Sequence, residues 1–228
     1  MSAIDVGSRT QLRELPDGVP LPAAPPRPRW YAPAKRTIDV VLSLAILIGT
    51  SPFVLLAMLS IVVVSGGSPI YRQERVGLGG RRFRMYKLRT MVRNAHALLP
   101  ELRRFNEADG PVFKMRDDPR LHAVGALLRR TSLDELPNFI NVLLGDMAIV
   151  GPRPPLPEEV AHYDEYALRR LVVKPGITCL WQISGRSHLS FEEWMALDNA
   201  YIDGWSPWYD LEIVARTIPA VLRGVGAH

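Results

Sequence analysis

Two neighbouring carboxylates, Asp134 and Glu135, are the residues in this sequence best suited to chemistry. Glu135 follows Ser132 at the spacing of a capping box, in which a serine and a glutamate bond the first turn of a helix. The positive end of the helix dipole would help to keep both carboxylates ionised. An ionised aspartate can attack phosphorus or bind Mg²⁺. The pair therefore predicts either phosphoryl chemistry or an ordinary capped helix start.

Basic residues surround this pair in the sequence. Between positions 72 and 93 there are eight lysines and arginines, Lys87 among them, and one acid. Arg129 lies five residues before Asp134, and Arg153 stands between two prolines that restrict its backbone. Attack on a phosphoryl group requires positive charge around the phosphate oxygens and the leaving group. The same cluster would also suit an anionic lipid or nucleic acid.

A long uncharged segment precedes the basic block. No charged residue occurs at positions 40–71, and a continuous helix over the apolar part would be roughly 40 Å long, enough to cross a ~30 Å hydrocarbon core. Ser51 and Pro52 interrupt this run, since proline lacks a backbone donor and clashes with the preceding turn. The hydroxyls of Thr50 and Ser51 can bond backbone groups that the proline leaves free.

Two arrangements of this segment remain open: a proline-kinked helix that spans the membrane, and a helix-break-helix that enters and leaves on one face. Lys35 and Arg36 precede the segment, and the basic block follows it. Because lysine and arginine accumulate on the cytoplasmic side, positive charge at both ends favours two cytoplasmic ends. A buried hairpin of a soluble protein is disfavoured by the length of the uncharged run.

The organisation of the chain follows from these patterns. Residues 1–34 are rich in proline and predict a flexible tail, residues 35–67 the membrane segment, and residues 68–228 an α+β, mostly helical domain. Cys179 is the single cysteine, so the chain cannot form an internal disulfide. The expected strands are Ile70–Val76 and Phe83–Leu88, joined as a hairpin by a glycine turn at 77–80, and Met147–Val150. The expected helices are Met91–Phe105, Leu121–Arg130, Ser132–Leu144, which Gly145 should stop, and Trp208–Leu222.

Several linked motifs resemble the bacterial sugar transferase family, the monotopic phosphoglycosyl transferases. The resemblance runs from Lys35 to the C-terminus, and an ordered set of this kind is far more specific than one motif. The motifs are KRTID at 35–39, the Ser51-Pro52 break, QERVG at 73–77, YKLRTM at 86–91, DPR at 118–120, LRRTSLDELP at 128–137, GDM at 145–147, GPRP at 151–154 and KPGITCLWQISGRS at 174–187.

The resemblance implies a small cytosolic catalytic domain with a re-entrant membrane hairpin broken at Ser51-Pro52 and with interfacial amphipathic helices. It places the protein on the cytoplasmic face of the bacterial inner membrane. It also implies that Asp134 attacks the β-phosphate of a UDP-sugar, releases UMP and passes the sugar phosphate to polyprenyl (undecaprenyl) phosphate. Mg²⁺ would bind at Asp134 and Glu135. Such a reaction begins the membrane stage of exopolysaccharide, capsule or glycan assembly.

Other residues receive roles from the same resemblance. Lys87, Arg129 and Arg153 fall at the basic positions of the family's active site, and Arg186 is a further candidate for phosphate or uridine. Cys179 replaces a glycine that is common in the family, which indicates a packing change. Three aromatic residues near the C-terminus fit either interfacial anchors or core packing, namely Trp205, Trp208 and Tyr209.

Two other functions are compatible with parts of this sequence. One is a non-catalytic membrane-surface protein that binds anionic lipid or nucleic acid, but it would have no use for Asp134 and Glu135. The other is a glycosyltransferase that moves the sugar alone and releases UDP. We expect no nucleic-acid partner, and a homodimer is an open alternative to a monomer.

Overall fold

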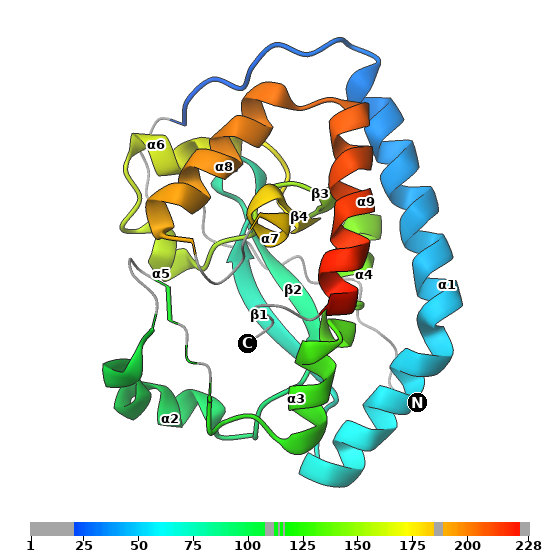
Figure 1. Ribbon diagram of the computed structural model, residues 1–228, viewed down its shortest axis with the longest axis vertical. Helices are drawn as coiled ribbons and strands as arrows, with labels where there is room; N and C mark the ends of the chain where they lie inside the picture. The colour runs from blue at the N-terminus through cyan, green and yellow to red at the C-terminus, as the bar shows by residue number, and fades with distance from the viewer. Residues whose placement is uncertain (1–20, 108–111, 114, 116, 185–188, 224–228) are drawn as a thin grey trace.

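The computed structural model describes residues 21–107, 112–113, 115, 117–184 and 189–223. The predicted α+β, mostly helical class is confirmed (Figure 1). In chain order the elements up to the middle of the chain are α1 (Tyr31–Ser65), β1 (Ile70–Val76), η1 (Leu78–Gly80), β2 (Arg82–Leu88), α2 (Ala95–Leu102), η2 (Arg103–Phe105), α3 (Ala123–Arg130), η3 (Leu133–Glu135) and α4 (Asn138–Leu144). The remainder comprises β3 (Ala148–Val150), α5 (Pro157–Val160), α6 (Glu165–Leu168), η4 (Arg169–Val172), β4 (Gly176–Thr178), α7 (Leu180–Ile183), α8 (Phe191–Gly204) and α9 (Pro207–Arg223).

Two small sheets carry the strands. β1 and β2 form the predicted antiparallel hairpin, with Tyr71 opposite Lys87. Its turn contains Gly79 at φ 68°, a left-handed conformation that glycine adopts without strain. The predicted strand before the Pro-Arg-Pro segment is also present as β3, and it pairs in parallel with β4, which the sequence patterns did not indicate.

Helix α1 continues through the predicted break. It runs as one helix of 35 residues with Pro52 inside, and its axis bends in the second half (Figure 1). Proline cannot donate to the carbonyl of Ile48, and the hydroxyl of Ser51 donates to that oxygen at 2.8 Å instead. The expectation that a hydroxyl bonds the backbone group freed by the proline is therefore confirmed. The helix itself is not interrupted. Both Ser51 and Pro52 are exposed.

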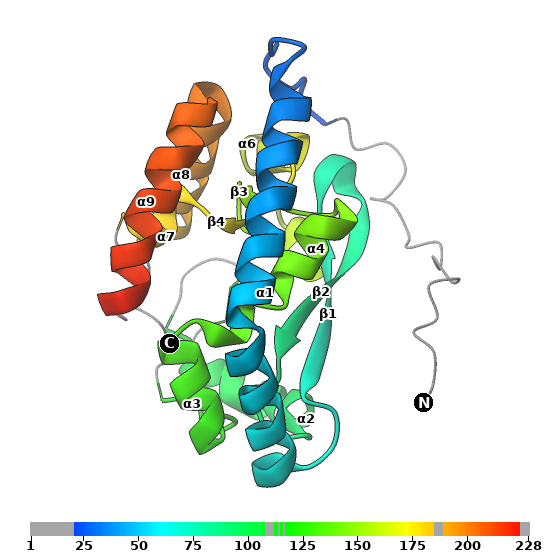
Figure 2. The ribbon, with the colours of Figure 1, turned by 90° about the vertical axis from the view of Figure 1, so that its right-hand side faces the viewer.

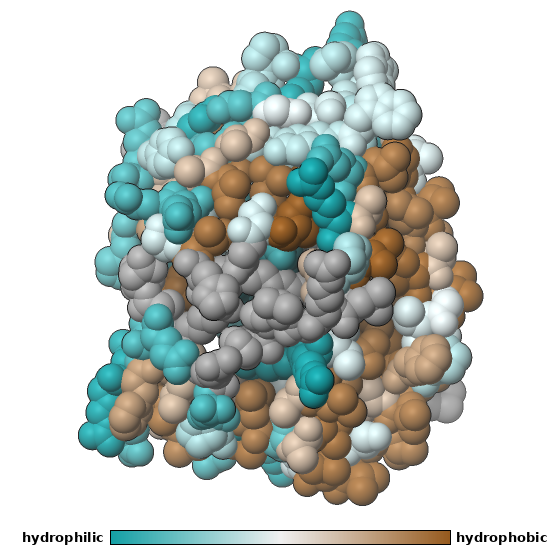
Figure 3. Space-filling model, in the orientation of Figure 1, coloured by the Kyte–Doolittle hydropathy of each residue, from teal (hydrophilic) through white to brown (hydrophobic). Residues whose placement is uncertain are grey.

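Most of α1 is exposed apolar surface, and the helix is long and apolar enough to cross a membrane. Brown, hydrophobic atoms gather along the edge of the molecule where α1 runs (Figure 3). A narrow inner stripe faces the rest of the domain, and Figure 2 shows α1 crossing in front of α4. The buried residues of this stripe are Tyr31, Asp39, Ser43, Ala57 and Ile61.

Both ends of α1 are bound to the rest of the domain. At the first end, Lys35 forms an ion pair of 2.6 Å with Asp210 on α9, and Arg36 donates to the carbonyl of Leu143 at 2.8 Å. At the other end, Arg89 donates to the hydroxyl of Ser65 at 2.8 Å. The same domain therefore holds α1 at its start and at its finish.

The chain before α1 also contacts the domain. The helix begins at Tyr31, four residues before the predicted segment, and Arg27 donates to the carbonyl of Trp205 at 2.7 Å. Trp205 meets the Tyr31 ring edge-on, with 4.6 Å between centroids, so its role is packing. Trp208, in contrast, is 79% exposed, as an interfacial anchor requires. Residues 1–20 of the predicted tail lie outside the described residues.

The main core lies where β2, α4, β3, α8 and α9 meet. Its most deeply buried members are aliphatic side chains of α4, α8 and α9, which removes apolar surface from water at roughly 25 cal/mol per Å². This packing places the hairpin beside the segment that carries the two carboxylates. The buried members are Phe83, Met85, Phe139, Val142, Met147, Ile149, Val150, Val173, Leu180, Tyr201, Ile202 and Ile213.

Candidate active site

The two carboxylates do not lie at the start of an α-helix, so the predicted capping box is wrong. Ser132 adopts a left-handed conformation with φ 55°, and its side chain caps nothing. Asp134 and Glu135 lie in the short 3₁₀ turn η3, and α4 begins only at Asn138. Pro137 immediately precedes α4, and since proline has no N–H, the α-helical hydrogen bonds start beyond it. The two carboxylates therefore do not lie in the first turn of an α-helix, where the helix dipole was expected to keep them ionised.

The hairpin brings a lysine to this turn. Lys87 on β2 forms an ion pair of 2.7 Å with Glu135. The carboxamide of Asn141, fully buried on α4, accepts from the backbone N–H of Tyr86 at 3.0 Å and donates to the carbonyl of Arg84 at 2.7 Å. These two hydrogen bonds between α4 and β2 set the position of Lys87 relative to η3.

Asp134 and Glu135 differ sharply in their surroundings. Asp134 is 7% exposed and, within the described part of the chain, forms no ion pair and no hydrogen bond to another side chain. Burial, opposed by the charge of Lys87, raises the pKa of Asp134 to about 6. Burial would also raise the pKa of Glu135, but the hydrogen-bonded ammonium of Lys87 brings it below its usual value. One carboxylate is thus paired, and the other faces the cavity.

Arg129 is positioned by a close approach of α3 to the end of the hairpin. A Cβ added at Gly125 would lie 1.9 Å from the carbonyl oxygen of Thr90, so only glycine permits this contact. One turn later, Arg129 donates from Nε to the hydroxyl of Thr90 at 3.1 Å. Burial lowers the pKa of Arg129 despite the nearby charges of Asp134 and Asp118.

Arg153 projects from the loop after β3. A Cβ added at Gly151 would lie 2.4 Å from the carbonyl oxygen of Lys174, so glycine allows the parallel strands to meet closely. The backbone beyond it is held by two buried arginines: Arg75 donates to the carbonyl of Pro154 at 2.9 Å, and Arg170 to that of Arg153 at 3.1 Å. The guanidinium of Arg153 lies 6.0 Å from the ring centroid of Trp181.

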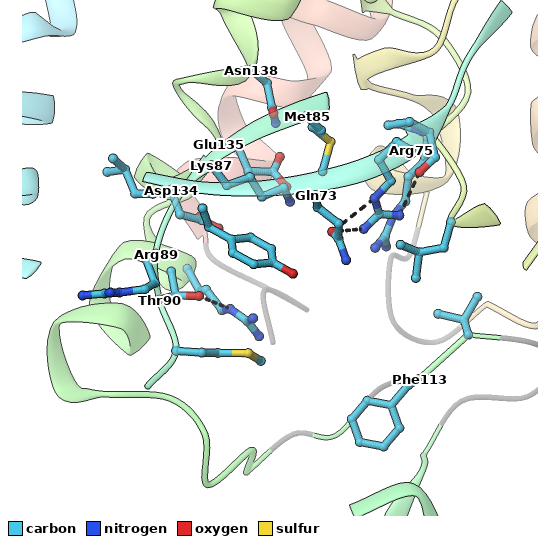
Figure 4. Close-up of a pocket in the computed structure, with 18 of the residues that line it drawn as sticks. Gln73, Arg75, Met85, Lys87, Arg89, Thr90, Phe113, Asp134, Glu135 and Asn138 are labelled. Carbon is cyan, nitrogen blue, oxygen red and sulfur yellow. Dashed lines mark hydrogen bonds and ion pairs between the residues drawn. The ribbon is translucent and has the colours of Figure 1, made fainter. Parts of the chain in front are cut away.

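A cavity of about 510 Å³ connects these groups. Asp134, Glu135, Lys87, Arg129 and Arg153 all line it. Figure 4 shows Asp134 and Arg75 on opposite sides of this cavity, with Phe113 facing it from below. A volume of this order accommodates a small ligand.

The cavity unites five of the six predicted chemical residues. The sixth, Arg186, lies outside the described residues. Ser51 and Pro52 do not line the cavity and belong to the outer surface of α1.

Sequence reasoning overlooked further polar groups of the cavity, namely Gln73, Arg75, Thr90 and Asn138. The strand pattern contains a signal for two of them. Alternate residues of a strand share one face, so Tyr71, Gln73 and Arg75 point to the same side of β1. Asn138 is 2% exposed, and the oxygen of its side-chain amide has no hydrogen-bond partner within the described residues.

The two carboxylates are compatible with Mg²⁺. Among the described residues there is no cluster of three or more histidine, cysteine, aspartate or glutamate side chains. Mg²⁺ commonly binds through one or two carboxylates and completes its shell with water and substrate phosphates. Asp134 and the second oxygen of Glu135 fit that mode, because Lys87 bonds only one oxygen of Glu135.

Comparison with known proteins connects this geometry to a family. The profile of the bacterial sugar transferase family matches residues 30–224. A UDP-glucose:undecaprenyl-phosphate glucose-1-phosphate transferase of Caulobacter vibrioides is 40% identical over 99% of this chain and 81% of its own length. The exopolysaccharide production protein ExoY of Sinorhizobium fredii is 42% identical over 86% of this chain and 88% of its own length.

A third relative is longer than this chain. The galactosyl transferase CpsE of Streptococcus agalactiae is 48% identical over 71% of this chain, but the match spans only 36% of that protein.

Proposed function

Because the chain belongs to the bacterial sugar transferase family, we propose that it transfers a sugar 1-phosphate from a UDP-sugar to polyprenyl (undecaprenyl) phosphate. The names of the Caulobacter and Sinorhizobium relatives support this substrate pair and a place in exopolysaccharide synthesis. In this proposal the product is a polyprenyl diphosphate sugar, and UMP is released. A transferase that moved the sugar alone would break the bond between the sugar and the β-phosphate oxygen, and it would release UDP.

The contrast between the two carboxylates carries the proposed mechanism. Asp134 has no side-chain partner among the described residues and faces a cavity lined by arginines, whereas Glu135 is bound to Lys87 at 2.7 Å. A nucleophile must keep a lone pair available, and a buried carboxylate without a partner does so at low cost in rearrangement. We therefore assign attack on the phosphate to Asp134 and the electrostatic support to Glu135 and Lys87.

The proposed reaction has two displacements. A carboxylate oxygen of Asp134 attacks the β-phosphorus, the bond from this phosphorus to the bridging oxygen breaks, and UMP leaves with that oxygen. An oxygen of polyprenyl phosphate then attacks the same phosphorus, and the bond to Asp134 breaks, which restores the carboxylate. Arg129 and Arg153 would bind the phosphate oxygens, where negative charge is spread in the transition state.

Mg²⁺ would be held by Asp134 and Glu135. When bound, it would neutralise diphosphate charge and so assist departure of the nucleotide. Other residues of the chain hold the two phosphate-binding arginines in place. Thr90 orients Arg129, and the hydrogen bonds of Arg75 and Arg170 to backbone carbonyls fix the loop of Arg153.

We further propose that α1 enters and leaves the cytoplasmic face of the bacterial inner membrane. The ties of Lys35 to Asp210 and of Arg89 to Ser65 support this arrangement, because one folded domain on one side of a bilayer binds both ends of the helix. The exposed apolar surface between these ends would contact lipid. Trp208 on α9 would lie at the interface.

The identity of the released nucleotide tests the reaction. Enzyme mixed with UDP-sugar and Mg²⁺ alone should release UMP up to about one equivalent per active site, because the first displacement needs no acceptor. Initial-rate plots at several acceptor concentrations should give parallel lines. Release of UDP would establish a sugar-only transferase, and intersecting lines without an initial burst would reduce Asp134 to a metal ligand.

Cysteine labelling tests the arrangement of α1. Single cysteines placed before Lys35 and after Arg72, in a Cys179→Ser background, should both react from the cytoplasmic side. Labelling of the first position from the opposite side would mean that α1 spans the membrane. Pro52→Ala restores a backbone donor, and we expect it to shift α1 toward the spanning form.

A further inference from the structure

Arg75 is a buried arginine that differs from the others in the described chain. Three arginines are almost fully enclosed: Arg75 at 4% exposure, and Arg120 and Arg170 at 6% each. Arg120 pairs with Asp118 at 2.5 Å, and Arg170 with Asp198 at 2.6 Å. A buried charge is costly unless an opposite charge balances it, and these two pairs follow that rule.

Within the described chain, the hydrogen-bond partners of Arg75 are all neutral. Its Nε and one terminal nitrogen donate to the carbonyl oxygen of the Gln73 side chain at 3.2 and 2.7 Å, and the other terminal nitrogen donates to the backbone carbonyl of Pro154 at 2.9 Å. Among the described residues, no carboxylate lies within ion-pair distance of Arg75. The two acids whose charges act on Arg75 have other direct partners: Glu159 accepts from the backbone N–H of Leu156, and Glu135 pairs with Lys87.

A second cation adds to this imbalance. Arg153 lines the same cavity, and in the described part of the chain it has no ion pair or side-chain hydrogen bond. Burial, followed by the charge of Arg153, lowers the pKa of Arg75 to about 10, so the arginine still carries its charge at neutral pH. The acids that line this cavity in the described chain form no ion pair with either guanidinium group, so a bound anion would be the first direct charged partner of both.

The guanidinium of Arg75 retains donors for such an anion. An arginine has five N–H groups, and three of those on Arg75 are used by Gln73 and Pro154. One N–H on each terminal nitrogen remains. A planar pair of donors of this kind matches two oxygens of a phosphate.

The position of Arg75 indicates which phosphate it would bind. Figure 4 shows Arg75 across the cavity from Asp134, with Gln73 beside it. In phosphoryl transfer the attacking and leaving oxygens lie roughly in line on opposite sides of phosphorus. If attack comes from the side of Asp134, the leaving phosphate lies on the side of Arg75.

We propose that Arg75, oriented by Gln73 and acting with Arg153, binds the phosphate that leaves with the nucleoside. This inference rests on the proposed function, in which that leaving group is UMP. The subsite would neutralise charge that develops on the departing oxygen and would hold UMP until release. Gln73 is its positioning residue, because it bonds two nitrogens of the Arg75 guanidinium.

The affinity for UMP relative to uridine measures this phosphate contact, since the two ligands differ only in the phosphate. In calorimetric titrations of the full chain, Arg75→Gln should weaken UMP binding by about tenfold to a hundredfold, as expected for hydrogen bonds to a charged group, and leave uridine binding unchanged. Arg72→Gln is the matched control, because Arg72 is an exposed neighbour on the same strand and should preserve the UMP-to-uridine ratio.

A second variant keeps the test valid if Arg75→Gln fails to fold. Gln73→Glu places a carboxylate beside Arg75 and supplies the missing counter-ion, so the midpoint of thermal unfolding should not fall. UMP binding should nevertheless weaken about tenfold or more, because the carboxylate occupies the guanidinium and repels phosphate. Uridine has no phosphate to be repelled, so its binding should stay at the wild-type level.

The outcomes separate the two proposals. A wild-type protein that releases UMP, together with an unchanged UMP-to-uridine ratio in both Arg75→Gln and Gln73→Glu, overturns the phosphate subsite and leaves the proposed function standing. Release of UDP by the wild type removes the proposed function and the subsite with it. Loss of UMP affinity in Gln73→Glu, with uridine affinity intact, supports the subsite.

Discussion

The two sides of the cavity differ in how their charged side chains are paired. On the side of η3, Glu135 and Lys87 neutralise each other at 2.7 Å, and only Asp134 is left without a side-chain partner in the described chain. On the opposite side, Arg75 and Arg153 face the cavity without any acid within ion-pair distance among the described residues. The η3 side pairs one carboxylate with one ammonium group and leaves a single carboxylate over, whereas the opposite side has an excess of positive charge.

This difference indicates a division of work. A group that forms and breaks a bond must have a defined protonation state, which neighbours such as Lys87 and Glu135 control. A group that binds a phosphate must keep donors free until the phosphate arrives. The internal ion pair therefore suits the reacting side, and the unmatched cations suit the binding side. The following variants test this contrast in order of expected effect.

Asp134→Asn should have the largest effect. Asparagine keeps the shape of the side chain but cannot form the acyl phosphate, so kcat/KM should fall by at least about 10³-fold, while the midpoint of thermal unfolding changes little. Radiolabelled transfer from UDP-sugar measures the loss. Glu74→Gln is the control, because Glu74 pairs with Arg82 and does not line the cavity. Substantial turnover by Asp134→Asn would remove the nucleophile assignment.

Glu135→Gln should be impaired less, by roughly tenfold to a hundredfold, since it leaves the nucleophile but removes the partner of Lys87. The pair is partly buried, with 22% and 31% of its side chains exposed, so we expect its loss to lower the unfolding free energy by about 1–2 kcal/mol. Recovery of activity at high Mg²⁺ would identify Glu135 as a metal ligand. A loss equal to that of Asp134→Asn would show that the two carboxylates act as one unit.

Lys87→Met should change the pH dependence more than the maximal rate. The pKa of Asp134 is raised to about 6 by burial, and the charge of Lys87 opposes this increase. Removal of that charge raises the pKa further, so a reaction that needs the ionised carboxylate loses activity at a higher pH on the acid side. The profile of kcat/KM against pH measures the shift. An acid limb that stays at the wild-type pH in Lys87→Met would contradict this coupling.

Arg84→Met is the control for this measurement, because Arg84 lies on the exposed face of the same strand. It should leave the acid limb at its wild-type position.

Thr90→Val should have the smallest effect. It removes the acceptor at 3.1 Å from Nε of Arg129 but leaves the charge in place. The loss of one orienting hydrogen bond, worth about 0.5–1.5 kcal/mol, should lower kcat/KM by about twofold to tenfold. Thr131→Val is the matched control, since the hydroxyl of Thr131 bonds only carbonyls within α3. Equal effects of both variants would mean that Thr90 does not orient Arg129.

Local sequence patterns predicted the hairpin and the end of α4 correctly, but they did not predict where α4 begins. The glycine turn and the alternating strands predicted the hairpin, and Gly145 ends α4 in a left-handed conformation as expected. The capping box at Ser132 was wrong, although the same pattern is real at Ser190 and Glu193, where α8 begins. The difference arises because a local motif competes with its surroundings, and Pro137 delays the helix that Ser132 was expected to start.

The sequence by itself determined the family motifs, the uncharged segment and five charged residues of the described cavity, but it did not single out Gln73, Arg75, Thr90 and Asn138. Only the tertiary structure decided which charges meet. Lys87 and Glu135 are 48 residues apart, and Arg75 and Pro154 are 79 apart, so neither contact has a local signal. The free energy of a charge depends on its neighbours within a few ångströms and on its burial. Those are properties of the packed chain, and they separate Asp134 from Glu135 and Arg75 from the other buried arginines.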